Sequence, residues 1–444
     1  MKAKVILLAS KQSTILRGHP WVFPKAISST SGKLVTGTLV EIASETGELV
    51  GLGVYNEHSL YRVRVLALAS ETCDQSSLPA LIDHRLQQAA LVRQCLQLPN
   101  ECTTAYRLFN SEADGLSGLT IDRFNKVCVV ASSAYWVELH KKDITEALQR
   151  LYPHDTILWL PQIKALAQDG WKQETDVANS GIHEMVVDPA DKPRDVGAGY
   201  MSGDVGAGYM SGDVGAGYVS GDVGAGYVSG DVGAGSNEVL EAGIKYQVNF
   251  AQSQKTGLFI DQRENHQRIA ALAAGKRVLD LYTYTGGFAL HAAKAGALAV
   301  TAVDSSEHAI AQAKTNAALN GLSEINFIEA DARDYLEKAG EYDIVVLDPP
   351  KLVPSRQHLE RAKNYYRFLH REVFKHMRIG SLLMTCNCSS ALSANEFCSL
   401  VSAQARAVGK QARIIGVYGP ASCHPTLAAF PEGNYLTAVL VAVV

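Results

Sequence analysis

Four stretches in the C-terminal half of the chain place glycines or carboxylates directly after apolar runs. They are VLDLYTYTGGF at 278–288, VTAVD at 300–304, EAD at 329–331 and VVLDPPK at 345–351. In an open parallel α/β sheet, ligands bind beside the carboxyl ends of the strands, so polar groups that follow successive strands meet in one crevice. The order of the four stretches therefore predicts such a crevice.

The first two stretches have the features of a nucleotide-binding turn. The turn that contains Tyr282, Thr285 and Gly286 lets the backbone approach a ligand before a helix begins. Asp304 follows Asp280 by 24 positions, where a carboxylate can accept hydrogen bonds from both ribose hydroxyls. A nicotinamide enzyme would share these features, but the glycine pattern here is not G-x-G-x-x-G.

The last two stretches add the groups that distinguish the ligand. Asp331 suits the amino group of an adenine, and Asp348, stiffened by the prolines after it, suits a flat heterocycle beside a methyl donor. Strand-end aspartates also cap helices, so any one of them alone is weak evidence. Taken in order, they predict S-adenosylmethionine as the cofactor and a base of nucleic acid as the substrate. The candidate cofactor-binding residues are Asp280, Tyr282, Thr285, Gly286, Asp304, Asp331, Asp348 and Pro349.

A fifth stretch, TCNCS at 385–389, contains candidate nucleophiles for the methylation of a pyrimidine. The C5 carbon of a pyrimidine is a poor nucleophile until a thiolate adds to C6 and makes C5 enamine-like. A cysteine at a strand end beside the Asp-Pro-Pro loop can make that addition. A buried, inert thiol is the alternative, since it is the usual state of a free cysteine.

The chain resembles the class I ribosomal RNA methyltransferases that form 5-methylcytosine in large-subunit ribosomal RNA, and the similarity runs nearly end to end. Further stretches that carry it are GHPWVF at 18–23, GLGVYNEHS at 51–59, RVRV at 62–65, NSEADGLSGLTIDRF at 110–124, QKTGLFIDQREN at 254–265 and HPTLAAFPEGNYL at 424–436. The resemblance implies an α/β protein with a small PUA-like RNA-binding barrel (1–70), a linker helix and an α+β middle domain (71–250), and a Rossmann-type class I methyltransferase domain (251–444).

The resemblance also implies catalytic roles. The family's nucleophilic cysteine immediately precedes a serine, which selects Cys388, with Cys386 as the fallback. Asp348 is implied to orient the edge of the cytosine. Other RNA cytosine methyltransferases have a second cysteine in the Asp-Pro motif, and DPPK has none, as in the resembled subfamily, so the base that removes the C5 proton is unassigned. Asn387 replaces the usual small residue and could alter how the thiol of Cys388 is presented.

The composition fits a globular protein of two or three domains. Of 444 residues, 47% are apolar and 19% charged, so the chain can bury substantial cores. No run of 18 apolar residues is present and the apolar start is too short for a convincing signal peptide, so we expect a cytoplasmic protein without membrane contact. The eight cysteines show no metal-type pairing with histidine, so reduced thiols and no metal are expected.

The net charge of −4 conceals local basic surpluses. Residues 1–69 hold eight Lys or Arg against four Glu, and residues 351–378 hold eight against two. The second stretch contains residues at four-residue spacing that form one stripe on a helix, here called the basic stripe. Its members are Lys363, Arg367, Arg371 and Lys375. The stripe is either a solvated face or a contact for RNA phosphates.

Residues 195–235 are a repeat array of four DVGAGY(M/V)SG nonapeptides and a truncated fifth copy. Three glycines in each complete copy carry a large ordering entropy and leave few side chains to bury. A small solenoid is the alternative, because Val and Tyr recur at fixed positions. We expect a flexible or loosely ordered surface insertion in the middle domain.

The remaining elements follow from turn residues and periodicity. We expect short strands over 1–69, a helix over 78–96, a hairpin of 118–123 with 126–132, a helix over 137–151, a strand over 156–160, and a return to the middle domain over 236–250.

The sequence thus predicts an S-adenosylmethionine-dependent methyltransferase that forms 5-methylcytosine in large-subunit (23S) ribosomal RNA, with the target base extruded from its stack. Two alternatives stay open. Asp-Pro-Pro loops also serve enzymes that methylate guanine or adenine, and a non-catalytic RNA-binding or ribosome-assembly factor could retain the pocket. Ribosomal RNA is the expected partner, and a homodimer is left open.

Overall fold

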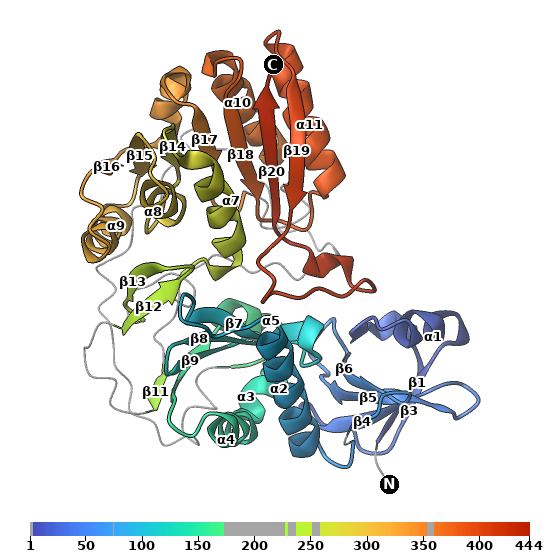
Figure 1. Cartoon of the computed structure of the whole chain (residues 1–444). Coiled ribbons are helices and arrows are strands. Elements are labelled where there is room, and N and C mark those ends of the chain that lie inside the picture. The colour runs from blue at the N-terminus through green and yellow to red at the C-terminus, as the bar shows by residue number, and fades with distance from the viewer. Residues whose placement is uncertain (1–2, 74, 173–226, 230–236, 251–257, 353–358) are drawn as a thin grey trace.

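The computed structural model of the chain consists of three units, each built on its own sheet (Figure 1). It describes residues 3–73, 75–172, 227–229, 237–250, 258–352 and 359–444. The repeat array lies outside the described residues except for the short strand at 227–229. No helix in the described ranges is long and apolar enough to cross a membrane.

The N-terminal unit is a six-stranded sheet with strand order β2-β6-β5-β4-β1-β3. Its elements are β1 (Lys4–Leu7), α1 (Ala9–Leu16), β2 (Trp21–Val22), η1 (Pro24–Ala26), β3 (Ile27–Ser31), β4 (Leu39–Ala43), β5 (Leu49–Tyr55) and β6 (Val63–Leu68). The two edge strands β2 and β3 are joined only by the single turn η1, so the sheet must curl to bring its edges together. The expected small barrel of short strands is therefore confirmed.

The middle unit is a five-stranded sheet with strand order β11-β10-β9-β8-β7, covered by the long helix α2. Its elements are α2 (Leu78–Cys95), β7 (Ala105–Asn110), η2 (Ser111–Asp114), β8 (Leu119–Phe124), β9 (Val127–Ser132), α3 (Tyr135–Leu139), α4 (Lys141–Leu151), β10 (Thr156–Pro161), α5 (Ile163–Gln168) and β11 (Tyr227–Ser229). The linker helix and the β8–β9 hairpin are confirmed.

The single helix expected over 137–151 is wrong, because the structure has two helices that meet at His140. The imidazole of His140 contacts the carboxylate of Asp143 through Nδ1 (2.9 Å) and the carbonyl of Gly37 through Nε2 (2.9 Å). These contacts tie the helix junction to the N-terminal unit, and a hydropathy pattern gives no sign of such a tertiary contact.

The strand β11 belongs to the fourth copy of the repeat array. It pairs antiparallel with β10 at the edge of the middle sheet, with Trp159 opposite Tyr227 and Ile157 opposite Ser229. One copy of the array therefore extends the sheet. The expectation of a flexible or loosely ordered insertion does not hold for these three residues.

The hairpin of β12 (Asn237–Glu241) and β13 (Ile244–Val248) forms a separate two-stranded sheet. The backbone N–H of Thr104 in the middle unit donates to the carbonyl of Leu240 (2.8 Å), and the backbone N–H of Gln247 donates to Asn316 of the C-terminal unit (3.0 Å). The hairpin thus connects the middle and C-terminal units, as its position in Figure 1 shows.

The C-terminal unit is a seven-stranded sheet with strand order β16-β15-β14-β17-β18-β20-β19, in which β20 runs antiparallel to both neighbours. Its elements are η4 (Ile260–Gln262), α7 (Arg263–Ala273), β14 (Arg277–Leu281), α8 (Gly287–Lys294), β15 (Ala299–Asp304), α9 (Glu307–Leu319), β16 (Asn326–Glu329), η5 (Ala332–Glu341), β17 (Ile344–Leu347), α10 (Leu359–His376), β18 (Leu382–Asn387), α11 (Ala394–Ala407), β19 (Ala412–Tyr418), η7 (Pro431–Gly433) and β20 (Thr437–Val443). The strand order reverses at β14, where open parallel sheets bind ligands.

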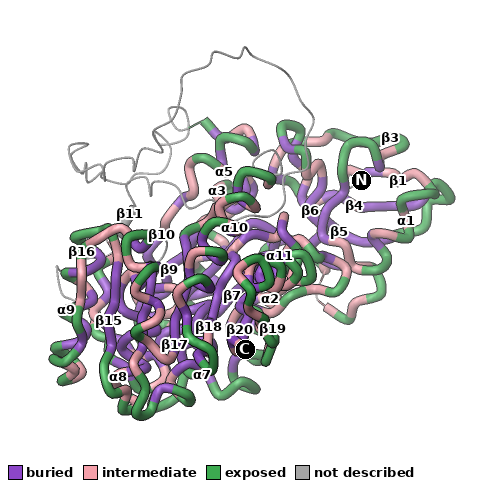
Figure 2. Tube along the Cα trace, turned by 90° about the horizontal axis from the view of Figure 1, so that it is seen from above, coloured by how far each residue is buried: buried purple, intermediate pink, exposed green. Residues whose placement is uncertain are grey.

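The central strands of this sheet are buried on both faces, which explains their continuous apolar sequences. Val346 packs into the core on one face, and Val345 and Leu347 pack into the core on the other. Figure 2 shows these strands as buried, with exposed helix surfaces around them. The predicted α/β fold is therefore confirmed.

The segment between β19 and β20, residues 419–436, crosses to the other two units and is here called the crossing segment. Arg93 of α2 donates to the carbonyl of Cys423 (2.9 Å), and Asn110 donates to the carbonyl of Pro425 (2.8 Å). The rings of Trp21 and Phe430 lie 4.6 Å apart. One loop of the C-terminal unit thus contacts both preceding units.

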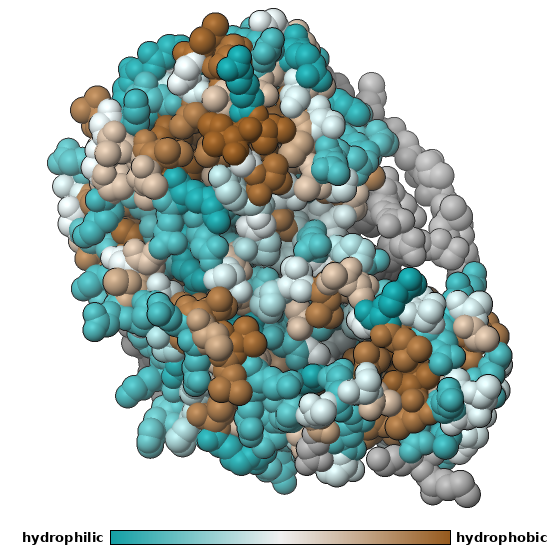
Figure 3. Space-filling view, turned by 45° about the vertical axis from the view of Figure 1, so that its right-hand side comes forward, coloured by the Kyte–Doolittle hydropathy of each residue, from teal (hydrophilic) through white to brown (hydrophobic). Residues whose placement is uncertain are grey.

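The surface is mostly hydrophilic, with separate apolar patches (Figure 3). One patch lies over the C-terminal unit, where the edge strand β19 exposes Ile414, Ile415 and Val417. The homodimer that the sequence analysis left open stays a hypothesis.

Candidate active site

The turn after β14 has an unusual backbone. Tyr282, Tyr284 and Gly286 all have positive φ angles (65°, 50° and 91°). Positive φ is uncommon for bulky residues and is retained mainly where the surroundings enforce it, often at ligand sites. The N–H of Thr283 donates to the carbonyl of Val303 on the neighbouring strand (3.0 Å), which fixes the turn.

Asp280 is fully buried beneath this turn. Its Oδ2 accepts hydrogen bonds from the hydroxyl of Thr283 (2.6 Å) and the N–H of Ala289 in the first turn of α8 (3.1 Å). Burial raises the pKa of the Asp280 carboxyl to about 6. This placement indicates that Asp280 shapes the turn from within, and direct contact with the cofactor stays a prediction.

Asp304 ends β15 beside the turn and is half-buried. Its Oδ2 accepts the N–H of Tyr284 (2.9 Å), and its Oδ1 accepts the N–H of Ser306 (3.0 Å). A carboxylate has about four acceptor positions, so two backbone bonds fix its orientation and leave capacity for two hydroxyls. The geometry therefore fits the predicted ribose contact.

The remaining predicted cofactor residues lie around the same strand ends. Asp331 follows β16 and accepts hydrogen bonds from the backbone N–H (2.8 Å) and the side-chain Nε (2.9 Å) of Arg333. These hydrogen bonds lower the pKa of the Asp331 carboxyl. The hydroxyl of Tyr282 lies 3.5 Å from that of Tyr365. Thr285 is buried in the turn, and Pro349 is buried after β17. The structure thus gathers the predicted residues at one edge of the sheet, and their individual contacts with the cofactor stay predictions.

Asp348 lies in the most unusual electrostatic environment of the crevice. Its Oδ2 accepts a hydrogen bond from Nε2 of Gln262 (3.0 Å). Burial, followed by the nearby carboxylates of Asp261 and Asp280, raises the pKa of Asp348 to about 7. Such a carboxyl can donate a hydrogen bond near neutral pH, and perturbed groups of this kind cluster at functional sites.

Two contributors to this site were not assigned from the sequence. Asp261, in η4, accepts a hydrogen bond from the hydroxyl of Tyr435 in the crossing segment (2.8 Å). Gln262 also accepts one from Asn265 (2.6 Å), which orients its amide toward Asp348. Asp261 and Gln262 belong to the stretch 254–265, and Tyr435 belongs to the stretch 424–436. Both stretches contributed to the family resemblance, but the resemblance assigned no role to these residues. Residues 254–257 lie outside the described ranges.

The two cysteines at the end of β18 differ in accessibility. Cys386 is fully buried beside Asp348 and Gln262, and burial holds the pKa of its thiol well above the usual value. Cys388 lies two residues further on, beyond the last hydrogen-bonded pair of the strand, and is half-buried. Accessibility therefore favours Cys388 over Cys386 as a nucleophile.

Asn387 has a structural role between these cysteines. Its side-chain amide donates to the carbonyls of Ser389 (3.0 Å) and Leu392 (3.1 Å), and its Oδ1 accepts from the hydroxyl of Tyr366 on α10 (3.3 Å). Asn387, which stands where a small residue is usual, therefore fixes the loop that carries Cys388. Burial raises the pKa of the Tyr366 hydroxyl well above its usual value.

The basic stripe lies on the outer face of α10, as the periodicity predicts. Tyr366, Leu369 and Val373 on the opposite face are fully buried. Lys363 is only 16% exposed and pairs with Glu360 (3.4 Å) and Glu396 (3.3 Å). Arg367 is half-buried and lies 4.0 Å from Glu360, whereas Arg371 is exposed. Only part of the stripe is therefore available to a phosphate.

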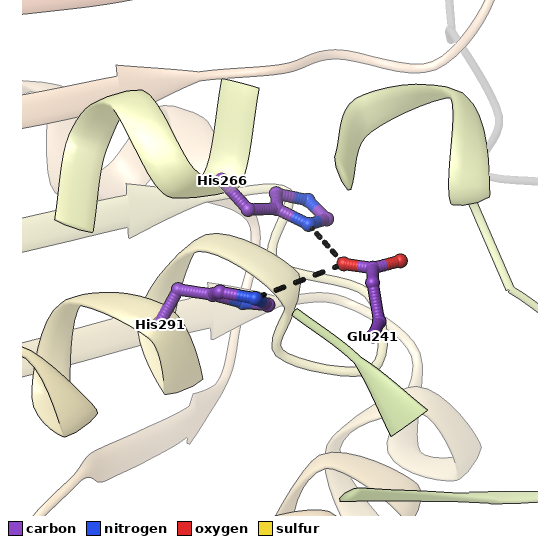
Figure 4. A group of neighbouring side chains, drawn as sticks. All are labelled: Glu241, His266 and His291. Carbon is purple, nitrogen blue, oxygen red and sulfur yellow. Dashed lines mark hydrogen bonds and ion pairs between the residues drawn. The ribbon is translucent and has the colours of Figure 1, made fainter. Parts of the chain in front are cut away.

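A buried cluster of polar side chains lies under the glycine turn (Figure 4). His266 of α7 and His291 of α8 both turn toward Glu241 of β12, with Nδ1 of His266 2.7 Å and Nε2 of His291 3.9 Å from its Oε1. Burial lowers the pKa of His291 to about 4, so it is neutral, and the shorter contact of Glu241 is with Nδ1 of His266. The three residues have the spacing of possible metal ligands. Their contacts join the β12–β13 hairpin to α7 and α8 of the C-terminal unit.

Comparison with known proteins agrees with this geometry. Residues 218–411 match the sequence pattern of S-adenosylmethionine-dependent methyltransferases, and residues 5–68 match that of PUA-like domains. An Aeromonas hydrophila protein named ribosomal RNA large subunit methyltransferase I is 31% identical over 450 residues, covering 99% of each chain. This chain belongs to that family. An Escherichia coli O157:H7 member is 28% identical, covering 98% of each chain.

Solved structures show the same fold. A protein from Streptococcus mutans assigned as a SAM-dependent methyltransferase superposes with a TM-score of 0.72 at 17% identity, and a methyltransferase structure complexed with SAH superposes with a TM-score of 0.74 at 18% identity. Both matches cover 99% of each chain. Membership of the ribosomal RNA large subunit methyltransferase I family confirms the predicted S-adenosylmethionine cofactor and the PUA-like N-terminal domain.

Proposed function

We propose that this protein methylates C5 of a cytosine in large-subunit ribosomal RNA. The observation that carries the proposal is that Asp348 directly follows β17 and Cys388 directly follows β18, two adjacent parallel strands. The names of the relatives support the ribosomal RNA substrate. A thiol beside a carboxyl that can hold a proton supports a pyrimidine as the target base.

The residues of the crevice have separable roles in this proposal. Asp304 and the turn at 282–287 hold the cofactor, which supplies an electrophilic methyl group when bound. The thiolate of Cys388 adds to C6 of the extruded cytosine, and electron density moves toward N3 and C5. Asp348 in its protonated form donates a hydrogen bond to N3 and stabilises that charge. After C5 is methylated, its proton leaves to a base and the thiolate departs from C6, which restores the ring.

The decisive experiment combines product analysis with trapping. Purified protein and S-adenosylmethionine should methylate large-subunit ribosomal RNA, and nucleoside analysis should give 5-methylcytosine. RNA carrying 5-fluorocytosine at the target should stay covalently bound under denaturing conditions, because fluorine cannot leave as the proton does. Cys388→Ala should abolish both methylation and the adduct.

Cys386→Ala is the matched control. It removes a buried thiol of the same motif and should retain the adduct. An adduct that survives Cys388→Ala but not Cys386→Ala would reverse the assignment of the nucleophile. A methylated guanine or adenine as the product would contradict the proposed base.

A further inference from the structure

A cavity of about 170 Å³ lies where the three units meet. Trp21, Tyr61 and Arg64 of the N-terminal unit form one side, Gln162 of the middle unit forms another, and Phe430 of the crossing segment closes it. This cavity is here called the junction pocket. Its residues come from distant parts of the chain, and none of them is among the cofactor-binding or catalytic residues.

Aromatic rings line one side of the junction pocket. The rings of Trp21 and Tyr61 lie 4.0 Å apart at 33°, and that of Phe430 meets Trp21 edge-on at 4.6 Å. The guanidinium of Arg64 lies 4.9 Å from the centre of the Tyr61 ring. Nucleobases of unpaired nucleic acid bind by stacking on walls of this kind.

The polar groups of the pocket have hydrogen-bonding capacity that the fold does not use. Arg64 is buried, with Nη1 bound to Ser117 (2.8 Å) and Nη2 to Asp169 (3.0 Å), and its Nε has no partner among the described residues. Glu112 accepts one bond from Ser117 (2.7 Å) and has further acceptor capacity. The side-chain amide of Gln162 makes no hydrogen bond with any described residue.

The charge of the lining determines which part of a nucleotide fits. Arg64 and Asp169 form a buried ion pair, so Glu112 leaves this side of the pocket with a negative charge. A phosphate would be repelled, whereas a carboxylate accepts hydrogen bonds from an exocyclic amino group such as N4 of cytosine. Cytosine, adenine and guanine carry such a group, and uracil does not.

The junction pocket is linked to the catalytic crevice through a shared wall. Tyr435 lines the pocket, and its hydroxyl donates to Asp261. The next residue, Gln262, donates to Asp348 in the crevice. An RNA strand whose target base enters the crevice would therefore pass close to the pocket.

We propose that the junction pocket binds a second, unstacked base of the RNA substrate, one that carries an exocyclic amino group and lies near the methylated base. This inference rests on the proposed function for the identity of the substrate. Stacking on Tyr61 supplies affinity, and Gln162, Glu112 and Arg64 supply hydrogen bonds to the edge of the base.

The test compares Tyr61→Leu and Gln162→Ala with Gln149→Ala, which removes an exposed amide of α4 far from the pocket lining. The Kd for large-subunit ribosomal RNA should rise by about 5- to 100-fold in Tyr61→Leu, the range measured for a lost stacked base. It should rise by about 2- to 10-fold in Gln162→Ala, which loses one hydrogen bond. Gln149→Ala should match the wild type, and all three variants should keep wild-type affinity for S-adenosylmethionine.

Cross-linking locates the contact and does not depend on catalysis. Irradiation at short wavelength should join the RNA to a peptide containing Tyr61 or Phe430. If wild-type protein methylates the RNA while Tyr61→Leu and Gln162→Ala bind it normally, the junction pocket proposal is wrong and the proposed function stands. If methylation fails in the wild type but these variants lose RNA affinity, the proposed function is wrong and the pocket remains an RNA site. Tyr61 packs against Trp21, so Gln162→Ala decides the test if Tyr61→Leu is unfolded.

Free nucleotides distinguish the source of the base. Competition by saturating CMP or AMP, with UMP weaker, would support recognition of an amino group. Tight binding of a free mononucleotide without any effect of the variants on RNA affinity would overturn the assignment to RNA.

Discussion

The cofactor crevice and the junction pocket are built in opposite ways. The crevice collects the ends of neighbouring parallel strands, and each strand has its own short motif, such as Asp304 after β15 and Asp348 after β17. The junction pocket collects Trp21, Gln162 and Phe430, which are separated by more than a hundred residues along the chain. A site made of strand ends can be predicted from short sequence motifs, whereas a site formed where units meet can be recognised only in the tertiary structure.

The largest effect on activity is expected from substitution of Asp348 in the crevice, which should change the chemical step. Asp348→Ala removes the group that donates a hydrogen bond to N3, so kcat/KM should fall by about 10²- to 10³-fold. In the wild type the carboxyl is protonated below its pKa of about 7, so this contribution should decline as the pH rises through 7. The variant should lack that decline in a pH profile. Glu307→Ala, at an exposed carboxyl on α9, is the control, and a full alkaline decline in Asp348→Ala would assign the decline to another group.

The next effect concerns the cofactor alone. Asp304→Ala should weaken S-adenosylmethionine binding by at least about tenfold, because each charge-assisted hydrogen bond contributes about 1.5 to 3 kcal/mol. Calorimetry on the folded variant measures this directly. Gln162→Ala in the junction pocket should leave cofactor affinity unchanged. Equal cofactor affinity in the wild type and Asp304→Ala would show that Asp304 does not bind the cofactor. A strand-end motif would then have failed to identify a ligand-binding residue.

A smaller effect concerns phosphate contacts outside both sites. Neutralising Arg367 and Arg371 should reduce the slope of log K against log salt by about two units, since each lost contact releases roughly one fewer counterion. Lys363→Ala should change the slope less, because Lys363 already pairs with Glu360 and Glu396. Salt titrations of RNA binding give these slopes. A slope that stays constant in the arginine variant would identify the basic stripe as a solvated face.

The smallest effect is expected from deletion of residues 195–235. The deletion removes the short edge strand β11, but β10 keeps its pairing with β9. Methyl transfer and cooperative unfolding in urea should therefore be nearly unchanged. Loss of either property would show that the repeat array supports the middle unit.

The parts of the fold that the sequence predicted are those with short-range signals. The helix from Leu78 and the hairpin through Asn125 follow from apolar periodicity and turn residues, and both are confirmed. The break at His140 was missed because hydropathy gives no sign of the contact that its imidazole makes with a carbonyl of the N-terminal unit. The domain boundaries stay a prediction, because the hairpin β12–β13 contacts both of its neighbours.

The candidate site divides in the same way. The positions of Asp304, Asp348 and Cys388 could be expected from their strand-end motifs. The bond between Tyr435 and Asp261 could not, because 174 residues separate the partners and no local pattern records the contact. The role of Asn387 also needed the structure, since its amide serves carbonyls of a loop that is irregular.

The crossing segment has a consequence for the order of events during synthesis. The N-terminal and middle units can fold as soon as their own sequences emerge from the ribosome. The junction pocket cannot form then, because Phe430 and Tyr435 are made hundreds of residues later. A nascent chain surrounded by ribosomal RNA would therefore lack a completed pocket, and it could bind a base there only after β20, the strand that follows the crossing segment, has joined the sheet.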